Sequence, residues 1–294
     1  MIKKSIHILL LCCALSVLPV QADIMVLVHG YLGDADSWEV SGINDELHRR
    51  GWARAGMFRG SPAGPVLFVT DYKDAKNLVY VATLPSIAPI AVQADVLKTI
   101  IDIVQRKHPG EKMILVGHSA GGLVARTALI RYRLNNIRAL ITIAAPHVGT
   151  SLADQALSIT ANHGPFNMVK SFVGGSGYNA LKRSRALLFD LRYPRPGNLL
   201  YWLNIQPHPD IAYASIIRVR PNGIPGDYYV PGFSQDMNSV PALRGRSAVT
   251  FTPTGHFLVR QDADTIVDII NKLEIPPGLA NARPPVRTRT DNNP

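Results

Sequence analysis

The sequence predicts an α/β fold in which a mainly parallel β-sheet is covered by helices on both faces. Short apolar runs bounded by Gly or Pro alternate with longer stretches of helical periodicity. The run Ile24–Val28 is apolar throughout, as expected of a strand buried on both faces. Residues with catalytic chemistry follow several of the predicted strands. Because parallel strands share one carboxyl edge, we expect the functional site at that edge.

The predicted elements follow a regular order along the chain. We expect first a strand ending at His29, a helix near Ser37–Arg50, a hairpin around Val66–Val81, a helix over Ile90–Lys107, a strand over Met113–Val116, a helix from Gly122 and a strand over Ala139–Ile143. Later come strands over Ile211–Val219 and Ala248–Thr252 and a helix over Asp264–Leu273, whose apolar residues recur at helical spacing. No internal repeat interrupts this series.

Residues 151–204 break the alternation of strands and helices, and we interpret them as a cap insertion. They contain a glycine cluster at 174–177 that could act as a hinge. The apolar positions expected to face the site are Ile159, Phe166, Met168, Val169, Phe172 and Val173. The alternative is a static insertion whose apolar residues complete the core.

The N-terminus predicts export from the cytoplasm. Lys3 and Lys4 precede an apolar stretch over Ile6–Leu18 and a small-residue cleavage site ending at Ala22, the pattern of a signal peptide over residues 1–22. The mature protein would be secreted or periplasmic. Both cysteines, at 12 and 13, would leave with this peptide, so the fold must hold without disulfides. Residues 23–274 then form one domain, and the Pro-, Asn- and Arg-rich tail over 275–294 is expected to be disordered.

A pentapeptide at 117–121, Gly-His-Ser-Ala-Gly, lies between a predicted strand and a predicted helix. This context is typical of a nucleophile elbow, in which Ser119 occupies a strained turn. Gly117 and Gly121 are needed because side chains two residues before and after the serine would collide. The elbow places the Ser119 hydroxyl at a helix N-terminus, where amide groups favour negative charge.

The first predicted strand empties into the loop His29-Gly30-Tyr31, which we expect to form part of an oxyanion hole. The expected donors are the backbone N–H groups of Tyr31 and of Ala120, the residue after the nucleophile. His29 precedes this hole, and we interpret it as a buried residue that braces the loop.

The other two catalytic roles fall in late loops. Asp227 follows the strand over Ile211–Val219 and is the expected orienting carboxylate, although a turn aspartate bonded to its own backbone is the alternative. Asp236 is the fallback acid. His256 lies between the last strand and the last helix and is the expected general base. The chain order Ser119, Asp227, His256 is the order found in α/β-hydrolases.

With these motifs the sequence resembles the secreted bacterial triacylglycerol lipases and related esterases of the α/β-hydrolase superfamily. The matching stretches are Val26–Tyr31, Leu115–Arg126, Ile141–Thr150, Asp227–Pro231 and Ser234-Gln235. The resemblance implies a lipid ester substrate, because the Pro-His-x-Gly-Thr element at 146–150 is typical of lipases and of deacylases acting on lipid-linked substrates. Tyr228 stands where such lipases often have Gly, and their cysteine pair is missing. Many of them hold calcium near the catalytic His, but Asp262 and Asp264 give no ligand set, so no metal is assigned.

The sequence therefore predicts a secreted serine hydrolase that cleaves carboxylic esters, foremost acylglycerols or other acyl-lipid esters. No organic or redox cofactor is implied. The alternatives within the fold are a short-chain carboxylesterase, a polyester depolymerase and an acyltransferase, and the alternative of another class is a non-catalytic binding protein. The formal net charge is +10 for the full chain and +8 once Lys3 and Lys4 are removed with the signal peptide. This charge would favour anionic lipids or envelope polymers, or it reflects only a solvated basic face. No motif supports nucleic-acid binding.

Overall fold

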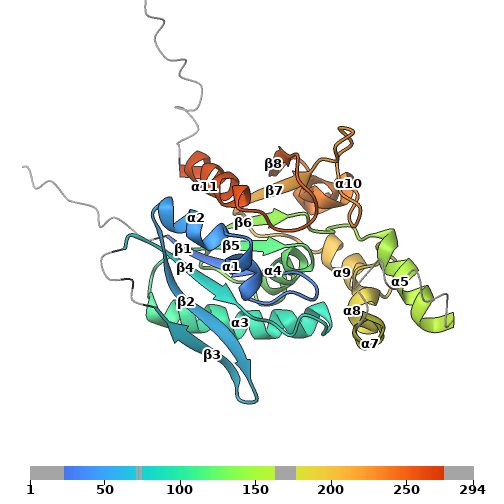
Figure 1. Cartoon of the computed structure of the whole chain (residues 1–294), viewed down its shortest axis with the longest axis horizontal. Helices are drawn as coiled ribbons and strands as arrows, with labels where there is room; N and C mark the ends of the chain where they lie inside the picture. The colour runs from blue at the N-terminus through green and yellow to red at the C-terminus, as the bar shows by residue number, and fades with distance from the viewer. Residues whose placement is uncertain (1–22, 71, 73–74, 163–176, 275–294) are drawn as a thin grey trace, which may run out of the picture.

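The computed structural model describes residues 23–70, 72, 75–162 and 177–274. An eight-stranded sheet runs through its centre in the order β3-β2-β4-β1-β5-β6-β7-β8 (Figure 1). The strands are β1 Ile24–Val28, β2 Trp52–Ser61, β3 Gly64–Val69, β4 Asn77–Ala82, β5 Met113–His118, β6 Ile137–Ile143, β7 Ala212–Arg218 and β8 Ser247–Thr252. Neighbouring strands pair in parallel everywhere except between β2 and β3. The predicted mainly parallel sheet is confirmed.

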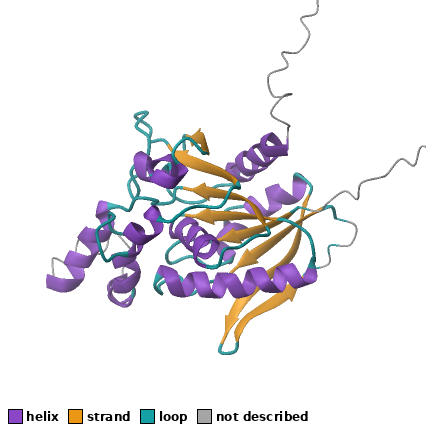
Figure 2. Cartoon of the chain, turned by 180° about the vertical axis from the view of Figure 1, so that it is seen from behind, coloured by secondary structure: helices purple, strands orange, loops and turns teal. Residues whose placement is uncertain are grey.

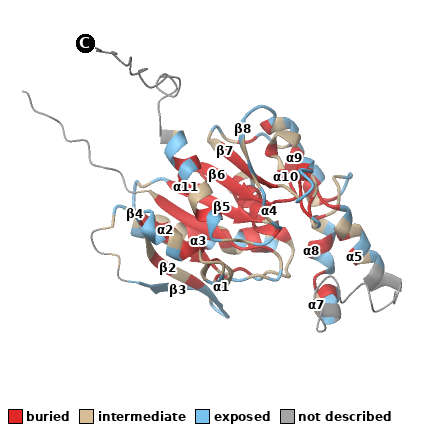
Figure 3. Cartoon of the chain, turned by 45° about the horizontal axis from the view of Figure 1, so that its top comes forward, coloured by how far each residue is buried: buried red, intermediate tan, exposed pale blue. Residues whose placement is uncertain are grey.

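Helices cover both faces of the sheet (Figures 1 and 2). On one face lie α3, Ile90–Lys107, and α4, Ala120–Arg131, and on the other lie α1, Asp36–Val40, α2, Ile43–Arg49, and α11, Gln261–Glu274. The side chains of β1 alternate between the two resulting cores: Ile24, Val26 and Val28 join the first, and Met25 and Leu27 join the second. All five are fully buried, which is why this strand is apolar throughout. Figure 3 shows the central strands as the most continuous buried part of the molecule.

Two expectations about the first third of the chain are wrong. The hairpin predicted around Val66–Val81 does not form: β3 pairs with β2 in antiparallel register, and β4 lies in parallel between β2 and β1. The sequence gives little sign of β2, because this strand carries Arg54, Arg59 and two glycines and is half exposed near the sheet edge. The single helix expected near Ser37–Arg50 is broken into α1 and α2 at Gly42, whose φ of 77° is a left-handed conformation.

The described part of the segment between β6 and β7 contains four helices. They are α5 Ser151–Asn162, α7 Gly177–Arg183, α8 Arg185–Asp190 and α9 Leu199–Ile205. Three of them, α5, α7 and α8, stand together beside one end of the sheet (Figure 1). Residues 174–176 of the predicted glycine hinge lie outside the described residues, whereas Gly177 begins α7. Also outside the described residues are the apolar positions Phe166, Met168, Val169, Phe172 and Val173, the side chain of Ile159, the signal peptide and the C-terminal tail. The function of this segment as a cap stays a prediction.

The late part of the chain follows the predicted order closely. The strands expected over Ile211–Val219 and Ala248–Thr252 are β7 and β8, and the last helix begins three residues earlier than expected, at Gln261. Between β7 and β8 lie α10, Gly232–Gln235, and two short 3₁₀ turns at Met237–Ser239 and Pro241–Leu243. Among the residues described, no helix combines the length and apolar character needed to cross a bilayer.

Candidate active site

The turn between β5 and α4 holds Ser119 in a conformation that few residues adopt. Its φ is 52° and its ψ is −127°, a strained combination for a residue with a side chain. A Cβ atom on Gly117 would lie 2.6 Å from the backbone nitrogen of Gly122, and one on Gly121 would lie 2.3 Å from the carbonyl oxygen of His29. Both positions therefore require glycine, as the elbow interpretation predicted.

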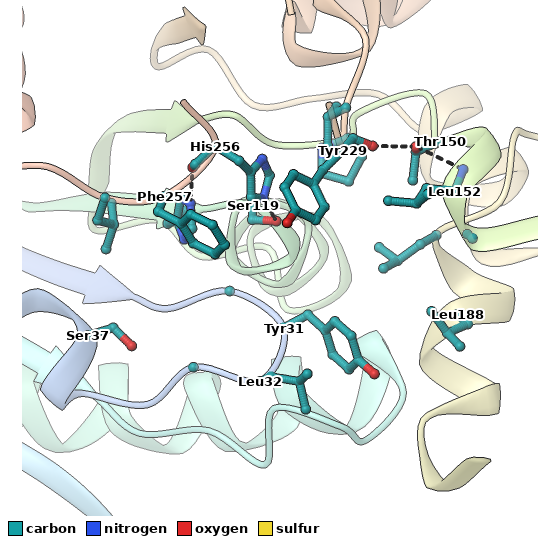
Figure 4. A pocket seen from close by; sticks show the side chains of 18 of the residues that line it. Tyr31, Leu32, Ser37, Ser119, Thr150, Leu152, Leu188, Tyr229, His256 and Phe257 are labelled. Carbon is teal, nitrogen blue, oxygen red and sulfur yellow. Dashed lines mark hydrogen bonds between the residues drawn. The ribbon is translucent and has the colours of Figure 1, made fainter. Parts of the chain in front are cut away.

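Three loops at the carboxyl edge bring Ser119, His256 and Asp227 into one hydrogen-bonded chain. His256 Nδ1 lies 2.8 Å from Asp227 Oδ2, and His256 Nε2 lies 2.9 Å from Ser119 Oγ. Since an ionised carboxylate only accepts hydrogen bonds, Nδ1 carries the ring proton and Nε2 accepts from the Ser119 hydroxyl. The imidazole faces the serine directly (Figure 4). The structure thus brings together all three side chains singled out in the sequence.

Asp227 is held as an ionised acceptor. Its Oδ1 accepts from the N–H groups of Tyr229 and Val230, at 2.7 and 2.8 Å. Burial alone would raise the pKa of Asp227, but the hydrogen bond and the charge of His256, together with the two N–H donors, hold this pKa below its usual value. The carboxylate is therefore available to orient and stabilise the imidazole. The fallback acid Asp236 instead uses its carboxylate on the backbone and side chain of Asn238.

Gln235 holds the carboxylate from a third side. Its Nε2 donates to Asp227 Oδ2 at 2.9 Å and to the carbonyl of Val230 at 2.8 Å, and its Oε1 accepts from the N–H of Arg218 at 2.8 Å. The side chain is fully buried. Gln235 thereby fixes the acid loop to the end of β7. The sequence alone assigned no function to Gln235, because a glutamine eight residues after an aspartate is not a recognisable motif.

His118, directly before Ser119, fixes the loop that carries His256. Its Nε2–H donates to the carbonyl of His256 at 2.9 Å. Burial is the main cause that lowers the pKa of His118 to about 3, and the nearby His256 adds to it. The ring is therefore neutral at any ordinary pH and keeps its proton on Nε2. Sequence reasoning treated this position only as a variable residue of the pentapeptide.

A buried ion pair supports the other end of the His256 loop. Arg218, at the end of β7, donates to both carboxylate oxygens of Asp262, at 2.6 and 2.8 Å, and to the carbonyl of Phe257 at 3.1 Å. Both charged side chains are almost completely excluded from solvent. Asp262, considered above beside a possible calcium, is thus occupied by Arg218. Within the described ranges, no three His, Cys, Asp or Glu side chains come close enough together to hold a metal ion.

The loop after β1 lies against Ser119. His29 is fully buried; its Nδ1 donates to the carbonyl of Gly30 at 2.9 Å and its Nε2 accepts from the N–H of Leu84 at 2.9 Å, so it braces the loop as expected. A Cβ atom on Gly30 would come within 2.9 Å of the Ser119 Cβ. Tyr31 follows this contact directly and Ala120 begins α4. Their joint function as an oxyanion hole stays a prediction.

A pocket of about 740 Å³ opens above Ser119. This volume lies within the range of small-molecule sites. Residues from the β1 loop, α1, the segment before α5, α5 itself, α8 and both catalytic loops line it. In Figure 4, Ser119 lies at its centre, with Tyr31 and Leu32 along the side opposite His256. A substrate in this pocket would meet the serine hydroxyl directly.

The parallel sheet, the elbow and this arrangement of Ser, Asp and His define a member of the α/β-hydrolase superfamily. Residues 21–170 match the family model described as the PGAP1-like alpha/beta domain. Because the match covers half of the chain, the chain belongs to this family.

Several solved bacterial proteins have a similar fold. The product of gene lin2722 of Listeria innocua superposes with a TM-score of 0.52 at 18% identity, covering 86% of this chain and 92% of that one. The mature form of the lipase BlEst2 of Bacillus licheniformis gives a TM-score of 0.51 at 16% identity, covering 87% and 94%. Its propeptide form gives 0.56 at 17% identity, covering 88% of this chain and 51% of that one. No curated protein matches the sequence.

Proposed function

We propose that this protein is a serine hydrolase of carboxylic esters whose preferred substrates are acylglycerols or other acyl-lipid esters. The observation that carries the proposal is the unbroken hydrogen-bonded chain from Asp227 through His256 to Ser119 at the base of a pocket. Nucleophile, base and orienting acid within hydrogen-bond reach of one another are what acyl transfer through a covalent intermediate requires.

The mechanism follows from the proton positions. Ser119 Oγ attacks the ester carbonyl while its proton passes to His256 Nε2, and Asp227 stabilises the imidazolium that forms. The bond to the alcohol then breaks as His256 returns the proton to the leaving oxygen. Water, activated by the same imidazole, attacks the acyl-enzyme and releases the acid. The N–H groups of Tyr31 and Ala120 are the proposed donors to the negatively charged carbonyl oxygen.

Apolar side chains around the pocket favour a lipid over a small polar ester. Leu152, Leu188 and Leu191 line its side next to α5 and α8, and Leu32, Val40 and Phe257 line the opposite side with more than a third of their surface exposed. Exposed apolar residues beside a site are typical of contact with a lipid surface. We propose such contact as transient, and we propose export through residues 1–22.

Activity on emulsified long-chain triglyceride, compared with a soluble short-chain ester, tests the substrate class. A lipid hydrolase should act on the emulsion and show a rate increase when a medium-chain ester passes its solubility limit. Smooth saturation through that limit, with no action on the emulsion, would indicate a short-chain carboxylesterase. Transfer of the acyl group to added glycerol would indicate an acyltransferase, and degradation of a polyester film would indicate a depolymerase. A folded protein with no turnover of any ester would be a binding protein.

A further inference from the structure

The pocket has two unlike sides, and Ser119 lies between them. Figure 4 shows Leu152 and Leu188 on one side of the serine and Ser37 and Phe257 on the other. We call the first side, formed by Leu152, Ala153, Leu188 and Leu191, the closed arm. We call the second side, formed by Leu32, Ser37, Val40, Ser41 and Phe257, the open arm.

The closed arm is enclosed and apolar. Ala153 and Leu188 are each 2% exposed and Leu191 is 7% exposed, although all three line the pocket. Leu152 and Ala153 belong to α5, Leu188 belongs to α8, and Leu191 directly follows α8. Tyr31 secures this wall, because its hydroxyl donates to Ser184 Oγ at 3.0 Å, directly before α8. A chain that enters this arm exchanges water for hydrocarbon along its whole length.

The open arm is exposed and carries hydroxyl groups. Val40 is 89% exposed and Phe257 is 67% exposed. Ser37 in the short helix α1 and Ser41 at its end line this side. A group bound here keeps much of its contact with water, so its size is weakly restricted. Phe257 follows His256 directly, which places this arm beside the base that protonates the leaving alcohol.

From this asymmetry we propose that the closed arm binds the acyl chain of the substrate and that the open arm accepts its alcohol. The enzyme then discriminates among acyl chains and tolerates many alcohols, including hydroxyl-rich ones such as glycerol. The inference rests on the proposed ester hydrolysis and assigns the two halves of its substrate. Leu152 and Leu188 become specificity-determining residues.

Two ester series test the assignment. In the first, the alcohol is 4-nitrophenol and the acyl chain lengthens from acetyl; in the second, the acyl chain is fixed and the alcohol varies among methanol, butanol and glycerol, followed by acid release. We expect kcat/KM to rise about fourfold for each CH₂ that enters the closed arm and to fall once the arm is full. Across the alcohol series the change should stay within about fourfold.

Substitutions decide which arm sets the preference. Leu152→Trp should shift the acyl optimum to shorter chains, Leu152→Ala should shift it to longer ones, and neither should change the ranking of alcohols. Leu152 is only partly buried, so these variants should fold; Leu188→Phe is a second test from α8. Phe189→Trp is the matched control, since Phe189 is 45% exposed and does not line the pocket.

An acyl optimum that stays unchanged in folded Leu152→Trp and Leu188→Phe overturns the assignment, as does a change in alcohol ranking without a change in acyl optimum. Such results leave ester hydrolysis itself intact, because the unsubstituted protein still turns over. Failure of the unsubstituted protein to hydrolyse any ester of either series overturns the proposed function instead. The two failures are therefore distinguishable.

Discussion

At the scale of single residues, the site depends on strain and on saturated hydrogen bonding. Ser119 adopts a left-handed φ because glycines on either side leave room for the turn. Asp227 receives hydrogen bonds from His256, Gln235 and two backbone N–H groups. A side chain held by so many partners keeps one orientation, and preorganised groups of this kind are what acyl transfer needs.

Ser119→Ala should abolish ester turnover and leave the fold intact. The substitution removes only the nucleophilic oxygen, and in a triad that acts as a unit the loss is about a million-fold in kcat. Ester hydrolysis and thermal unfolding of the same preparation check both parts of the expectation. Activity near that of the unsubstituted protein would exclude Ser119 as the nucleophile.

Asp227→Asn should reduce kcat by roughly four orders of magnitude, because an amide favours the wrong imidazole tautomer. Asp236→Asn is the matched control. Its carboxylate is occupied by Asn238, so its loss should leave turnover within a few fold. Initial rates of both variants at saturating ester test which carboxylate orients the imidazole. An inactive Asp236→Asn together with an active Asp227→Asn would assign this function to Asp236 instead.

The sequence singled out Ser119, Asp227 and His256, which the fold brings together, but not the side chains that hold them in place. Ser119 is marked by its glycines, and Asp227 and His256 by their place after late strands. Gln235 and His118 act through hydrogen bonds between loops, which leave no periodic or spaced signal. Their functions become visible only once the chain is folded.

At the scale of elements, the central strands and β8 were predictable, and the pairing of β2 with β3 at the opposite edge of the sheet was not. Fully buried strands such as β1 must be apolar at every position, so their sequences are distinctive. The edge strand β3 and its neighbour β2 face solvent over much of their length, and their residues are mixed. Pairing between such strands is set by the tertiary fold rather than by local pattern.

One contact between elements should depend on pH. Asp190, at the end of α8, accepts from the N–H of Ile90 at the start of α3, at 2.9 Å. Burial raises the pKa of Asp190 from 3.8 to about 6. The folded protein therefore binds the Asp190 proton more tightly than the unfolded chain does. Protonated Asp190 contributes fully to the free energy of unfolding below pH 3.8, and this contribution is lost as the pH rises through about 6.

Asp190→Asn should remove this dependence, since an amide oxygen can accept from Ile90 without carrying charge. At neutral pH we expect the free energy of unfolding of the variant to exceed that of the unsubstituted protein by about 1–2 kcal/mol. This is less than the full pKa shift would give, because solvent partly screens the Asp190 charge. Urea unfolding at several pH values between 4 and 7 measures the difference. A difference between the two proteins that does not change over this range contradicts the expectation.

The Arg218–Asp262 pair should matter more than any surface ion pair. Asp262→Ala leaves a buried guanidinium without its carboxylate, which costs about 3–5 kcal/mol of stability. It also frees one end of the His256 loop, so kcat should fall as well. Asp36→Ala is the control: its pair with Arg59 is about half exposed, and such pairs contribute about 0–1 kcal/mol. Equal losses of unfolding free energy in the two variants would contradict this view.

At the scale of the whole molecule, the order of the chain agrees with the proposed export. The first strand begins at Ile24, directly after the expected cleavage site at Ala22. Asp23, the expected new N-terminal residue, pairs with Arg138 at 2.5 Å. Cleavage after Ala22 would therefore leave the sheet and this pair intact.

Export is tested by expression of the full chain in a bacterial host with a functional secretion pathway. We expect the protein recovered outside the cytoplasm to begin at Asp23, as N-terminal sequencing would show. Replacing Lys3 and Lys4 by Glu should keep the uncleaved chain inside the cell, because the positive n-region is lost. Uncleaved protein in the cytoplasm from both versions would rule out the signal peptide.

Covalent labelling can establish whether Ser119 is the nucleophile of a hydrogen-bonded triad. A serine-directed fluorophosphonate should add one phosphonyl group per molecule, and peptide mass spectrometry should place it on Ser119. Ser119→Ala should take up none, and Asp227→Asn should react far more slowly because its imidazole has the wrong tautomer. Absence of any adduct on the folded, unsubstituted protein, or an adduct on another residue, would contradict the account.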